Sequence, residues 1–444
     1  MNRTFKNVLV TASGLLVGLL LVGAVLGQNP APQASEPYRH LNVFTEVFAR
    51  IKSDYVEEPD MKNVTLGAIN GLLVTVDPFA SYLDASQYKA YLKAKEKQRA
   101  GLGLVLSRKY SAELSVVDAI PGSPSDQMGL STGDIIEAIN GVSTRDMPLA
   151  YADVMLEGEP GSTIELTVMR MRKPEPTTIK LTRAMVTPPA ITSKMLDSQT
   201  GYVVVQDLSK GKAAEVAAKV KDLARQGMKK LVLDLRNSAV QSAAEGAALA
   251  SLFLESGVIA TLEGQKYDKE TFKADPSKVV WKGEMVVLTS RGTVGAAEIA
   301  AAALQDNKRA KVVGERTYGD AAVRKTIPTG DGGALLLAVA KYKTPEGKTI
   351  QESSVTPSFP VAGNEADSAL EDEDSDTPAV QPAPKSEAAK PGEDAILKKA
   401  LEVLSGKAER VASKSPVDAA PGQPKVLTPL VGPAKQPLGV PVKQ

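Results

Sequence analysis

The sequence predicts an α/β fold class, in which the largest part is a sheet with packed helices over residues 186–362. Apolar runs of strand length alternate there with helical periodicities, as in a sheet covered by helices. Residues 99–185 open with an alternating strand and contain glycine-rich turns, which predicts a second, smaller and mostly-β part of the chain. Residues 38–98 repeat apolar side chains at helix spacing and predict an N-terminal helical segment. A chain of 444 residues has room for two or three such domains.

Composition excludes several functional classes. Lys and Arg number 53 against 52 Asp and Glu, a net charge of +1 that favours neither nucleic acid nor an acidic partner. The absence of Cys excludes disulfides, thiol catalysis and Cys-based metal sites. A single histidine, His40, excludes a Ser-His-Asp triad and a multi-His metal site. One Trp and 4% aromatic residues argue against a stacking surface for single strands. We therefore expect no cofactor and no metal.

Residues 1–37 are expected to be a signal peptide or membrane anchor followed by a linker. Arg3 and Lys6 precede residues 8–27, which carry no charge and are long enough to cross a bilayer. Positive charge on the short N-terminal side predicts export of the rest of the chain. Gly27 and its small neighbours also suit cleavage, so both a retained anchor and a cleaved signal stay open. The expected location is the bacterial periplasm, tethered to the inner membrane by residues 8–27 unless cleaved.

Residues 38–98 are predicted to be helical. Apolar side chains recur at helix spacing from Leu41 through Phe44 and Val47 to Ile51, and a second helix is expected over residues 64–76. We interpret this segment as packing against the protein core.

The opening of residues 99–185 reads Gly101-Leu102-Gly103-Leu104, and residues 122–141 read GSPSDQMGLSTGDIIEAING. These motifs, with a helix expected over 148–156, resemble a PDZ domain, and the resemblance implies a small, mostly-β, partly open barrel with helices. Such a domain offers a strand edge to which an extended peptide can add, while backbone N–H groups hold the terminal carboxylate. The expected peptide-binding residues are Gly101, Leu102, Gly103, Leu104 and Leu106, and their apolar side chains favour protein or peptide C-termini with an apolar last residue.

The α/β part contains the segment 285–325, which reads MVVLTSRGTVGAAEIAAAALQDNKRAKVVGERTYGDAAVRK. It predicts a strand, a turn, an alanine-rich helix and a second strand. The segment resembles the carboxyl-terminal processing peptidases (tail-specific proteases), whose turn carries a nucleophilic Ser, followed by a Lys that acts as its base and a Gln that orients the Lys. By this resemblance Gly295 stands at the Ser position, Asp320 at the Lys position and Arg324 at the Gln position. Glycine offers no nucleophile, so no catalytic residue is expected.

A second part of the expected site also departs from the family. Residues 231–254 resemble its L-D-L-R-x-N-P-G-G segment and the helix that follows, but Ala239, Val240 and Gln241 replace the Pro-Gly-Gly. Glycines there let backbone N–H groups approach a reacting carbonyl, and loss of one such donor is worth roughly 3–4 kcal/mol in the transition state. Residues 344–361 resemble the end of the family's core, with Ser354 at the position of a Gly.

Beyond the core, residues 363–392 are acidic and then rich in Pro and Ala, and predict a disordered linker. Residues 393–413 regain helical periodicity and resemble the terminal helix of many family members. Residues 414–444 are expected to be a disordered tail.

Three functions stay open from the sequence. The first is an exported, catalytically inactive family member that binds C-terminal peptides and acts on an active peptidase or an envelope complex. The second is an active serine peptidase with a relocated nucleophile, for which the candidates are Ser290, Thr293 and Ser242, with Lys308 or Lys325 as the base. Ser and Thr in such turns more often cap the next helix. The third, a purely structural oligomer, predicts no peptide in the PDZ groove.

Overall fold

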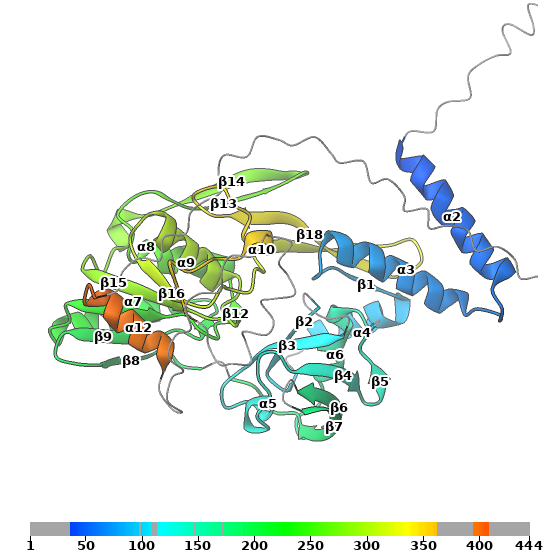
Figure 1. Ribbon diagram of the computed structural model, residues 1–444, viewed down its shortest axis with the longest axis horizontal. Coiled ribbons are helices and arrows are strands. Elements are labelled where there is room, and N and C mark those ends of the chain that lie inside the picture. Colours follow the sequence, from blue (N-terminus) through cyan, green and yellow to red (C-terminus); the bar gives the residue numbers. More distant parts are fainter. Residues whose placement is uncertain are drawn as a thin grey trace, which may run out of the picture.

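The computed structural model describes residues 36–96, 99–108, 113–145, 147–170, 173–187, 189–361 and 394–407. Figure 1 shows a core domain with a smaller domain beside it and two helices extending beyond both. The predicted targeting segment 8–27, the linker 363–392 and the tail 414–444 lie outside the described residues. Within the described part of the chain, no helix has the length and hydrophobicity that a membrane crossing requires. Those same residues contain no cluster of His, Cys, Asp or Glu that could hold a metal ion.

The core is built on a six-stranded sheet in the order β19-β16-β15-β11-β9-β8. Its strands are parallel except β8, which pairs antiparallel with β9 at the edge. Strand β11 is the most central of these and reads KLVLD, with apolar side chains on both faces, as expected for a parallel strand covered on both sides. The strands are β8 (Thr192–Met195), β9 (Thr200–Val204), β11 (Lys230–Asp234), β15 (Glu284–Thr289), β16 (Lys311–Gly314) and β19 (Phe359–Pro360).

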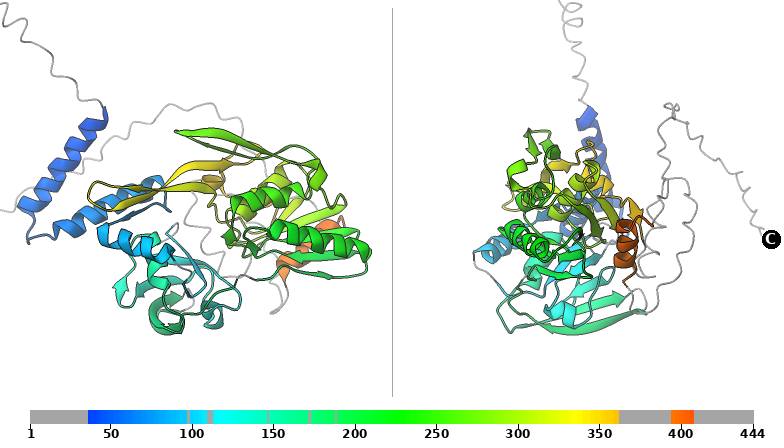
Figure 2. Two further views of the ribbon diagram at one scale, coloured as in Figure 1. Left: turned by 180° about the vertical axis from the view of Figure 1, so that it is seen from behind. Right: turned by 90° about the vertical axis from the view of Figure 1, so that its left-hand side faces the viewer.

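Helices cover both faces of this sheet. Leu231, Leu233 and Val287 point to the face packed against α7 (Lys212–Arg225), α8 (Ala243–Ser251) and α9 (Ala296–Asp306). Gly246 lets α8 approach α9 closely, because a Cβ there would lie 2.3 Å from the carbonyl oxygen of Ala296. The opposite face carries the C-terminal helix α12 (Ala395–Leu404), as Figure 2 shows. Its buried face consists of Ile396, Ala400, Val403 and Leu404.

A second sheet has the order β1-β18-β13-β14, with β17 also paired to β18. Its strands are β1 (Ser81–Leu83), β13 (Val258–Gly264), β14 (Tyr267–Lys273), β17 (Ala322–Pro328) and β18 (Ala334–Lys343). Smaller elements of the core are the parallel pair β10 (Asp207–Leu208) and β12 (Val240–Gln241), the 3-10 turn η1 (Pro276–Lys278) and α10 (Ile350–Ser353).

The smaller domain is a mostly antiparallel sheet with its own buried core of apolar side chains. The strand order is β2-β3-β4-β6-β7, with β5 paired to β4, so β2 lies at one edge. The elements are β2 (Leu104–Ser107), β3 (Leu114–Ala119), α5 (Pro124–Gln127), β4 (Ile135–Ile139), β5 (Val142–Ser143), α6 (Leu149–Leu156), β6 (Thr163–Arg170) and β7 (Lys173–Thr182).

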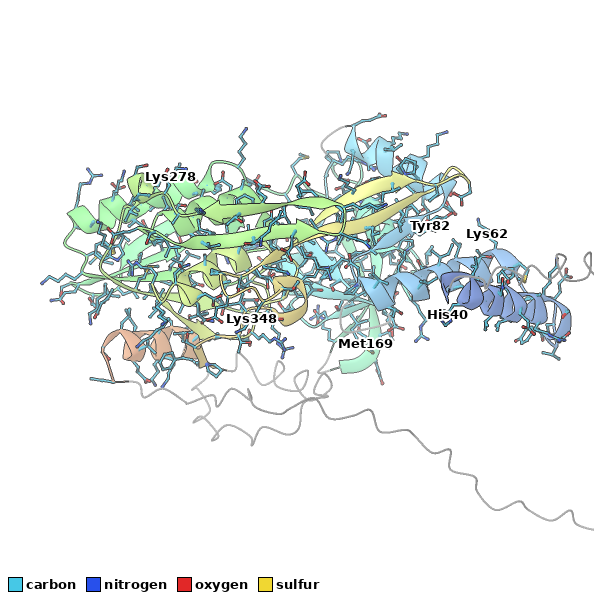
Figure 3. The ribbon with its side chains drawn as sticks, turned by 90° about the horizontal axis from the view of Figure 1, so that it is seen from above. His40, Lys62, Tyr82, Met169, Lys278 and Lys348 are labelled. Atoms are coloured by element: carbon cyan, nitrogen blue, oxygen red, sulfur yellow. The ribbon has the colours of Figure 1, made fainter. Side chains whose placement is uncertain are left out.

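The N-terminal helices are α2 (Glu36–Asp54), α3 (Met61–Val76) and α4 (Ala85–Lys95). Asp60 caps α3 by accepting from the N–H groups of Lys62 and Asn63, and Asp84 caps α4 in a capping box with Gln87. Figure 3 shows α2 and α3 lying together at one end of the molecule. The prediction that this segment packs against the core holds for residues 79–83, which are buried and whose strand β1 pairs with β18. It does not hold for α2, whose residues 40–54 are mostly exposed, and α3 contacts β1 without burying any of its residues. The periodicity of a sequence shows that a helix has an apolar face, but it does not show which part of the protein covers that face.

Candidate functional site

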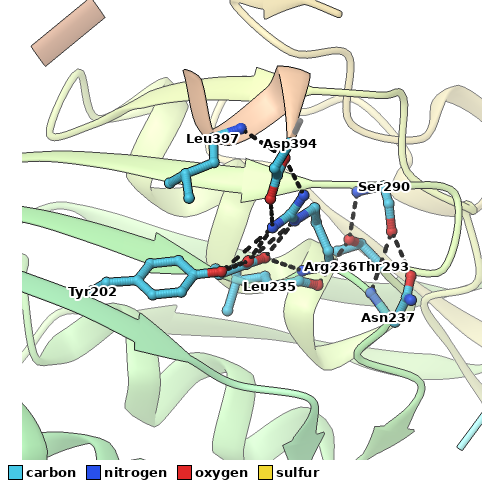
Figure 4. Close-up of polar contacts among 9 residues, drawn as sticks. Tyr202, Leu235, Arg236, Asn237, Ser290, Thr293, Asp394 and Leu397 are labelled. Carbon is cyan, nitrogen blue, oxygen red and sulfur yellow. Dashed lines mark hydrogen bonds and ion pairs between the residues drawn. The ribbon is translucent and has the colours of Figure 1, made fainter. Parts of the chain in front are cut away.

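The turn after β15 is held by its own hydroxyl groups. The Thr293 hydroxyl donates to the carbonyl oxygen of Leu235 at 2.8 Å and accepts from the N–H of Ser290 at 3.0 Å. The Ser290 hydroxyl donates to Oδ1 of Asn237 at 3.0 Å and accepts from the N–H groups of Asn237 and Gly292. Both side chains are buried or nearly so. These bonds tie the turn to the end of β11 (Figure 4).

Gly295 ends this turn and starts α9 in a backbone conformation that few residues tolerate. Its φ is 50° and its ψ is −100°, in the left-handed half of backbone space that favours glycine. The N–H of Gly295 donates to Oε2 of Glu298 at 2.8 Å. The position therefore presents backbone only, with no group that can attack a carbonyl.

Glu298 joins the two segments that the sequence placed at the nucleophile and base positions. Its side chain is 0% exposed. Besides Gly295, it accepts from the N–H of Gly319 at 2.6 Å, from the N–H of Asp320 at 2.8 Å and from the Thr317 hydroxyl. Burial raises the pKa of Glu298 to about 7, while the four donors act to lower it. The structure thus brings Gly295 and Asp320 together on one carboxylate.

Asp320 and Arg324 form an ion pair at the predicted base and orienting positions. The atoms Oδ1 of Asp320 and Nη2 of Arg324 lie 2.5 Å apart, with side chains 17% and 28% exposed. The Arg324 guanidinium also lies 4.7 Å from the centre of the Phe79 ring, a cation–π contact. Phe79 comes from the turn before β1, so this pair links the core to the N-terminal segment.

An apolar cluster surrounds these groups, which we call the joint cluster. It consists of Phe79, Val117, Val294 and Tyr318, with Val105, Leu149 and Ala239 packed against it. Phe79 and Tyr318 meet edge to face with ring centres 5.7 Å apart. The members come from the N-terminal segment, the smaller domain and the core. The joint cluster therefore packs the smaller domain against the turn that carries Gly295.

The turn at residues 239–241 is held by pairing with a neighbouring strand. Val240 and Gln241 form the short strand β12, which pairs in parallel with β10, and the N–H of Ser242 donates to the carbonyl oxygen of Leu208 at 2.9 Å. Ala239 packs against the joint cluster. The N–H of Val294 donates to the carbonyl oxygen of Ser238 at 3.1 Å, so this turn lies beside the one that ends at Gly295.

A polar network connects the same region to the C-terminal helix. Arg236 pairs with Asp234 at 2.6 Å and with Asp394, the N-cap of α12, at 2.9 Å. The Tyr202 hydroxyl donates to Asp234 at 2.6 Å. Asn237 follows directly and contacts Ser290 (Figure 4). Docking of α12 therefore fixes the residue that precedes Asn237.

In the described part of the chain, no candidate for a relocated nucleophile is hydrogen-bonded to a lysine. Ser290 and Thr293 use their hydroxyls in the bonds given above, and none of those partners is a lysine. Lys308 follows α9 at the far end of that helix, and Lys325 lies 6.0 Å from the centre of the Tyr267 ring. Among the described residues, no Ser or Thr hydroxyl is hydrogen-bonded to either lysine.

At the predicted peptide site, the described residues offer two free backbone donors. None of them accepts a hydrogen bond from the N–H of Leu102 or Gly103, whereas the N–H of Gly101 donates to Ala184 at 2.9 Å. Gly103 has a φ of 75°, and a Cβ there would lie 2.3 Å from Cβ of Ser123. Leu102 and Leu106 are 1% and 6% exposed and pack into the domain's own core, while Leu104 is half-buried. Peptide contacts at this edge would therefore fall mainly on the backbone and on Leu104.

Sequence reasoning did not assign a role to Glu298, Asn237 or Phe79. One signal pointed to Glu298, since it is the only charged residue in the run AAEIAAAAL and stands at the third position of the helix, where a side chain can reach back to the preceding turn. Nothing local marked Phe79, because its partners Tyr318 and Arg324 are distant in the chain.

Comparison with known proteins identifies the family. The model of Peptidase family S41 matches residues 199–361, and a PDZ domain model matches residues 115–170. A carboxy-terminal-processing protease of Bartonella bacilliformis is 30% identical over 362 residues, covering 80% of this chain and 82% of that protein. The carboxy-terminal processing protease CtpA of Bacillus subtilis is 29% identical, with coverage of 80% and 76%.

Among solved structures, a photosystem II D1 C-terminal processing protease superposes with a TM-score of 0.59 at 25% identity, covering 72% of this chain and 92% of that one. This chain belongs to the carboxy-terminal processing protease family, peptidase family S41, and carries a PDZ domain.

Proposed function

We propose that this chain is an exported, catalytically inactive member of the family, which holds protein C-terminal peptides in its PDZ domain as a scaffold or regulator of an envelope partner. The observation that carries this proposal is the environment of Gly295. A backbone-only residue stands where the resemblance puts the nucleophile, and the carboxylate at the base position is paired with Arg324.

The chemistry of peptide cleavage supports inactivity in three ways. A Ser–Lys dyad needs a hydroxyl and a neutral amine in hydrogen-bond reach, and neither Ser290 nor Thr293 has a lysine partner. The carboxylate of Asp320 would oppose an oxyanion forming beside it. The turn at 239–241 lacks the Pro-Gly-Gly of the family pattern, and its residues 240–241 form β12, paired with β10.

The binding half of the proposal rests on the edge strand β2. An extended peptide can pair with an unpaired strand edge, and its terminal carboxylate can accept from free backbone N–H groups. The N–H groups of Leu102 and Gly103 meet that requirement. Leu104 and the adjacent face of α6 favour an apolar last side chain on the peptide.

The test uses the full chain and ten-residue peptides that end in Ala-Leu-Val with a free carboxylate. Matched controls are the same peptide with a C-terminal amide and a peptide that ends in Asp. We expect binding by calorimetry, at least a tenfold loss of affinity for both controls, which is about 1.4 kcal/mol, and no product by mass spectrometry. The variant Gly103→Val, which strains the φ of 75°, should also lose binding.

Two results would contradict the proposal. Binding that is equal for the carboxylate and the amide would overturn the PDZ assignment. Enzyme-dependent cleavage that is abolished by Ser290→Ala, Thr293→Ala or Ser242→Ala would overturn inactivity and establish a relocated nucleophile. Export is tested separately, by asking whether protease added to spheroplasts digests the chain while cytoplasmic markers survive.

A further inference from the structure

A basic pocket lies at the end of the core where the strands of the six-stranded sheet begin. Its volume is about 500 Å³, and it lies between the first residues of β15 and β16 and the last residues of α9 and α12. Figure 1 shows α12 beside β15 and β16. Gly295 is at the opposite end of α9, so this pocket is separate from the site described above. Its charged lining residues are four basic ones and one acidic one, Lys282, Lys308, Arg309, Lys311 and Glu284.

Two of the cations in the basic pocket have no acidic partner in the described chain. Lys282 and Glu284 are each paired with a neighbour outside the pocket. The Arg309 guanidinium donates to three backbone carbonyl oxygens. Lys308 and Lys311 form no ion pair with any described residue. The negative end of the α9 dipole accounts for a lysine at 308, but not for Lys311, which begins a strand. Two such lysines in one hollow indicate an anionic occupant.

The chain itself supplies a segment of the matching charge. Residues 364–376, here called the acidic segment, read NEADSALEDEDSD and contain seven acidic side chains and no basic one. The net charge of the whole chain is +1, so the rest of the chain carries an excess of positive charge. The basic pocket is a place where part of that excess is concentrated and has no described counter-charge.

The acidic segment follows the described core at a position from which it can reach the pocket. The N–H of Val361 donates to the carbonyl oxygen of Gly314 at 2.9 Å, at the end of β16, and Lys311 begins the same strand. Along the strand, Gly314 and Lys311 are about 10 Å apart, and an extended chain spans up to about 13 Å from Val361 to Glu365. The first carboxylate of the segment is therefore within reach of Lys311.

The chain is also long enough to return from the pocket to the C-terminal helix. An extended chain from Val361 to Asp394, the N-cap of α12, spans up to roughly 110 Å. Asp394 is held by Arg236, which follows the end of β11, so both ends of this stretch are fixed at the end of the sheet opposite the pocket. A chain of that length can pass the pocket and come back.

We propose that the acidic segment occupies the basic pocket of its own chain, with its carboxylates paired to Lys308 and Lys311. Covalent linkage favours this occupant over an acidic segment of another molecule, because it keeps the segment at a high effective concentration. Val403 and Leu404 of α12 form another wall of the pocket. Occupation of the pocket and docking of α12 therefore stabilise each other. The proposal is independent of whether the chain binds or cuts peptides.

The experiment asks whether the segment in its own chain competes with a free copy of itself. A fluorescein-labelled peptide of residues 362–378 is titrated with the full chain, and fluorescence anisotropy gives the dissociation constant. The peptide should bind a neutralised full chain at least about tenfold more tightly than wild type, because the wild-type pocket is already occupied. The neutralised chain carries the substitutions Glu365→Gln, Asp367→Asn, Glu371→Gln, Asp372→Asn, Glu373→Gln, Asp374→Asn and Asp376→Asn.

Two pairs of lysine substitutions, made in the neutralised chain, test where the peptide binds. Lys308→Ala with Lys311→Ala should weaken peptide binding at least about tenfold. The matched control is Lys221→Ala with Lys266→Ala, since both lysines are exposed, lie outside the pocket and form no ion pair with a described residue. This control should change the dissociation constant less than about twofold. Raising the salt concentration from about 50 mM to about 500 mM should weaken the binding, because salt screens exposed charges.

A second measurement uses the absence of cysteine from the sequence. Ser375→Cys with Ser405→Cys places one cysteine in the acidic segment and one at the exposed end of α12 beside the pocket. Mild oxidation should join the two within one chain, seen as a shift on a non-reducing gel. Adding Lys308→Ala with Lys311→Ala should slow this oxidation at least about tenfold, because the segment no longer stays at the pocket.

Three results would overturn the proposal. Equal affinity of the peptide for the wild-type and neutralised chains would assign the pocket to an acidic segment of another protein. No peptide binding to the neutralised chain would remove the pocket as a site for acidic peptides. Peptide binding or disulfide formation that Lys308→Ala with Lys311→Ala leaves unchanged would place the acidic segment elsewhere.

Discussion

Replacing Glu298 by glutamine tests whether burial or hydrogen bonding controls the carboxylate at the centre of the site. Burial raises the pKa of Glu298 from the ordinary 4.5 to about 7. An unfolded chain releases this proton near pH 4.5, whereas the folded chain keeps it up to about pH 7. The unfolded state therefore binds fewer protons in that interval, and the folded state loses stability as the pH rises through it.

The magnitude follows from the width of the interval. From 4.5 to about 7, at about 1.4 kcal/mol for each pH unit, the loss is roughly 3 kcal/mol. Glu298→Gln has no proton to release, so its stability lacks this slope. The glutamine NH₂ also faces two of the backbone donors that the carboxylate accepts, and each donor left unpaired costs about 1–3 kcal/mol. Wild type should therefore be more stable than the variant, by a margin that shrinks as the pH rises.

The assay is urea unfolding of both proteins followed by circular dichroism, in steps of about half a pH unit from about pH 4.5 to about pH 8. The control is Glu284→Gln, at an ion-paired side chain that is 69% exposed, where the difference from wild type should stay nearly constant. Parallel pH curves for wild type and Glu298→Gln would refute the reasoning. A margin that grows with pH would show that the four donors outweigh burial and keep the folded carboxylate ionised.

Two further predictions concern stability. Phe79→Ala removes a side chain that is 7% exposed, together with its contacts to Tyr318 and Arg324. The variant should lower the free energy of unfolding by about 3–5 kcal/mol, measured by urea titration. A loss under about 1 kcal/mol would mean that the joint cluster does not hold the domains together. Ser354→Gly should raise the free energy of unfolding by about 1–3 kcal/mol, because Ser354 has a φ of 50° and ψ of −175° and a buried hydroxyl without a partner. The matched change Ser353→Gly, at the last position of α10, should lower it, and equal effects of the two would disprove the strain.

The strands and helices of the core could be predicted because their signals are local. The strand, alanine-rich helix and second strand predicted within residues 285–325 correspond to β15 (Glu284–Thr289), α9 (Ala296–Asp306) and β16 (Lys311–Gly314). The hairpin of β13 and β14 was not predicted, because β14 reads YDKETFK and is mostly exposed. A strand with so few apolar residues carries little of the alternation that sequence reasoning depends on.

The site could be predicted only in part, for a different physical reason. Gly295, Asp320 and Arg324 were singled out one position at a time, by resemblance. Their mutual arrangement depends on Glu298, whose acceptor bonds reach more than twenty residues along the chain, and on Phe79 from another segment. Such contacts have no periodicity in the sequence. The same limit explains why α3 was expected to pack inward and does not.

The changes at the site are coupled by its geometry. The carboxylate of Asp320 forms an ion pair with the guanidinium of Arg324, and the same guanidinium lies over the Phe79 ring. The ion pair and the packing of the ring therefore stabilise each other. Changing Asp320 alone to Lys would place two cations side by side against the joint cluster, and adding a Ser at 295 would impose a Cβ on a φ of 50°. Single reversions toward the family pattern should therefore lower stability before they could supply chemistry. The PDZ edge is only partly coupled to these contacts: Val105 of β2 packs against the joint cluster, whereas no described residue accepts a hydrogen bond from the N–H groups of Leu102 and Gly103.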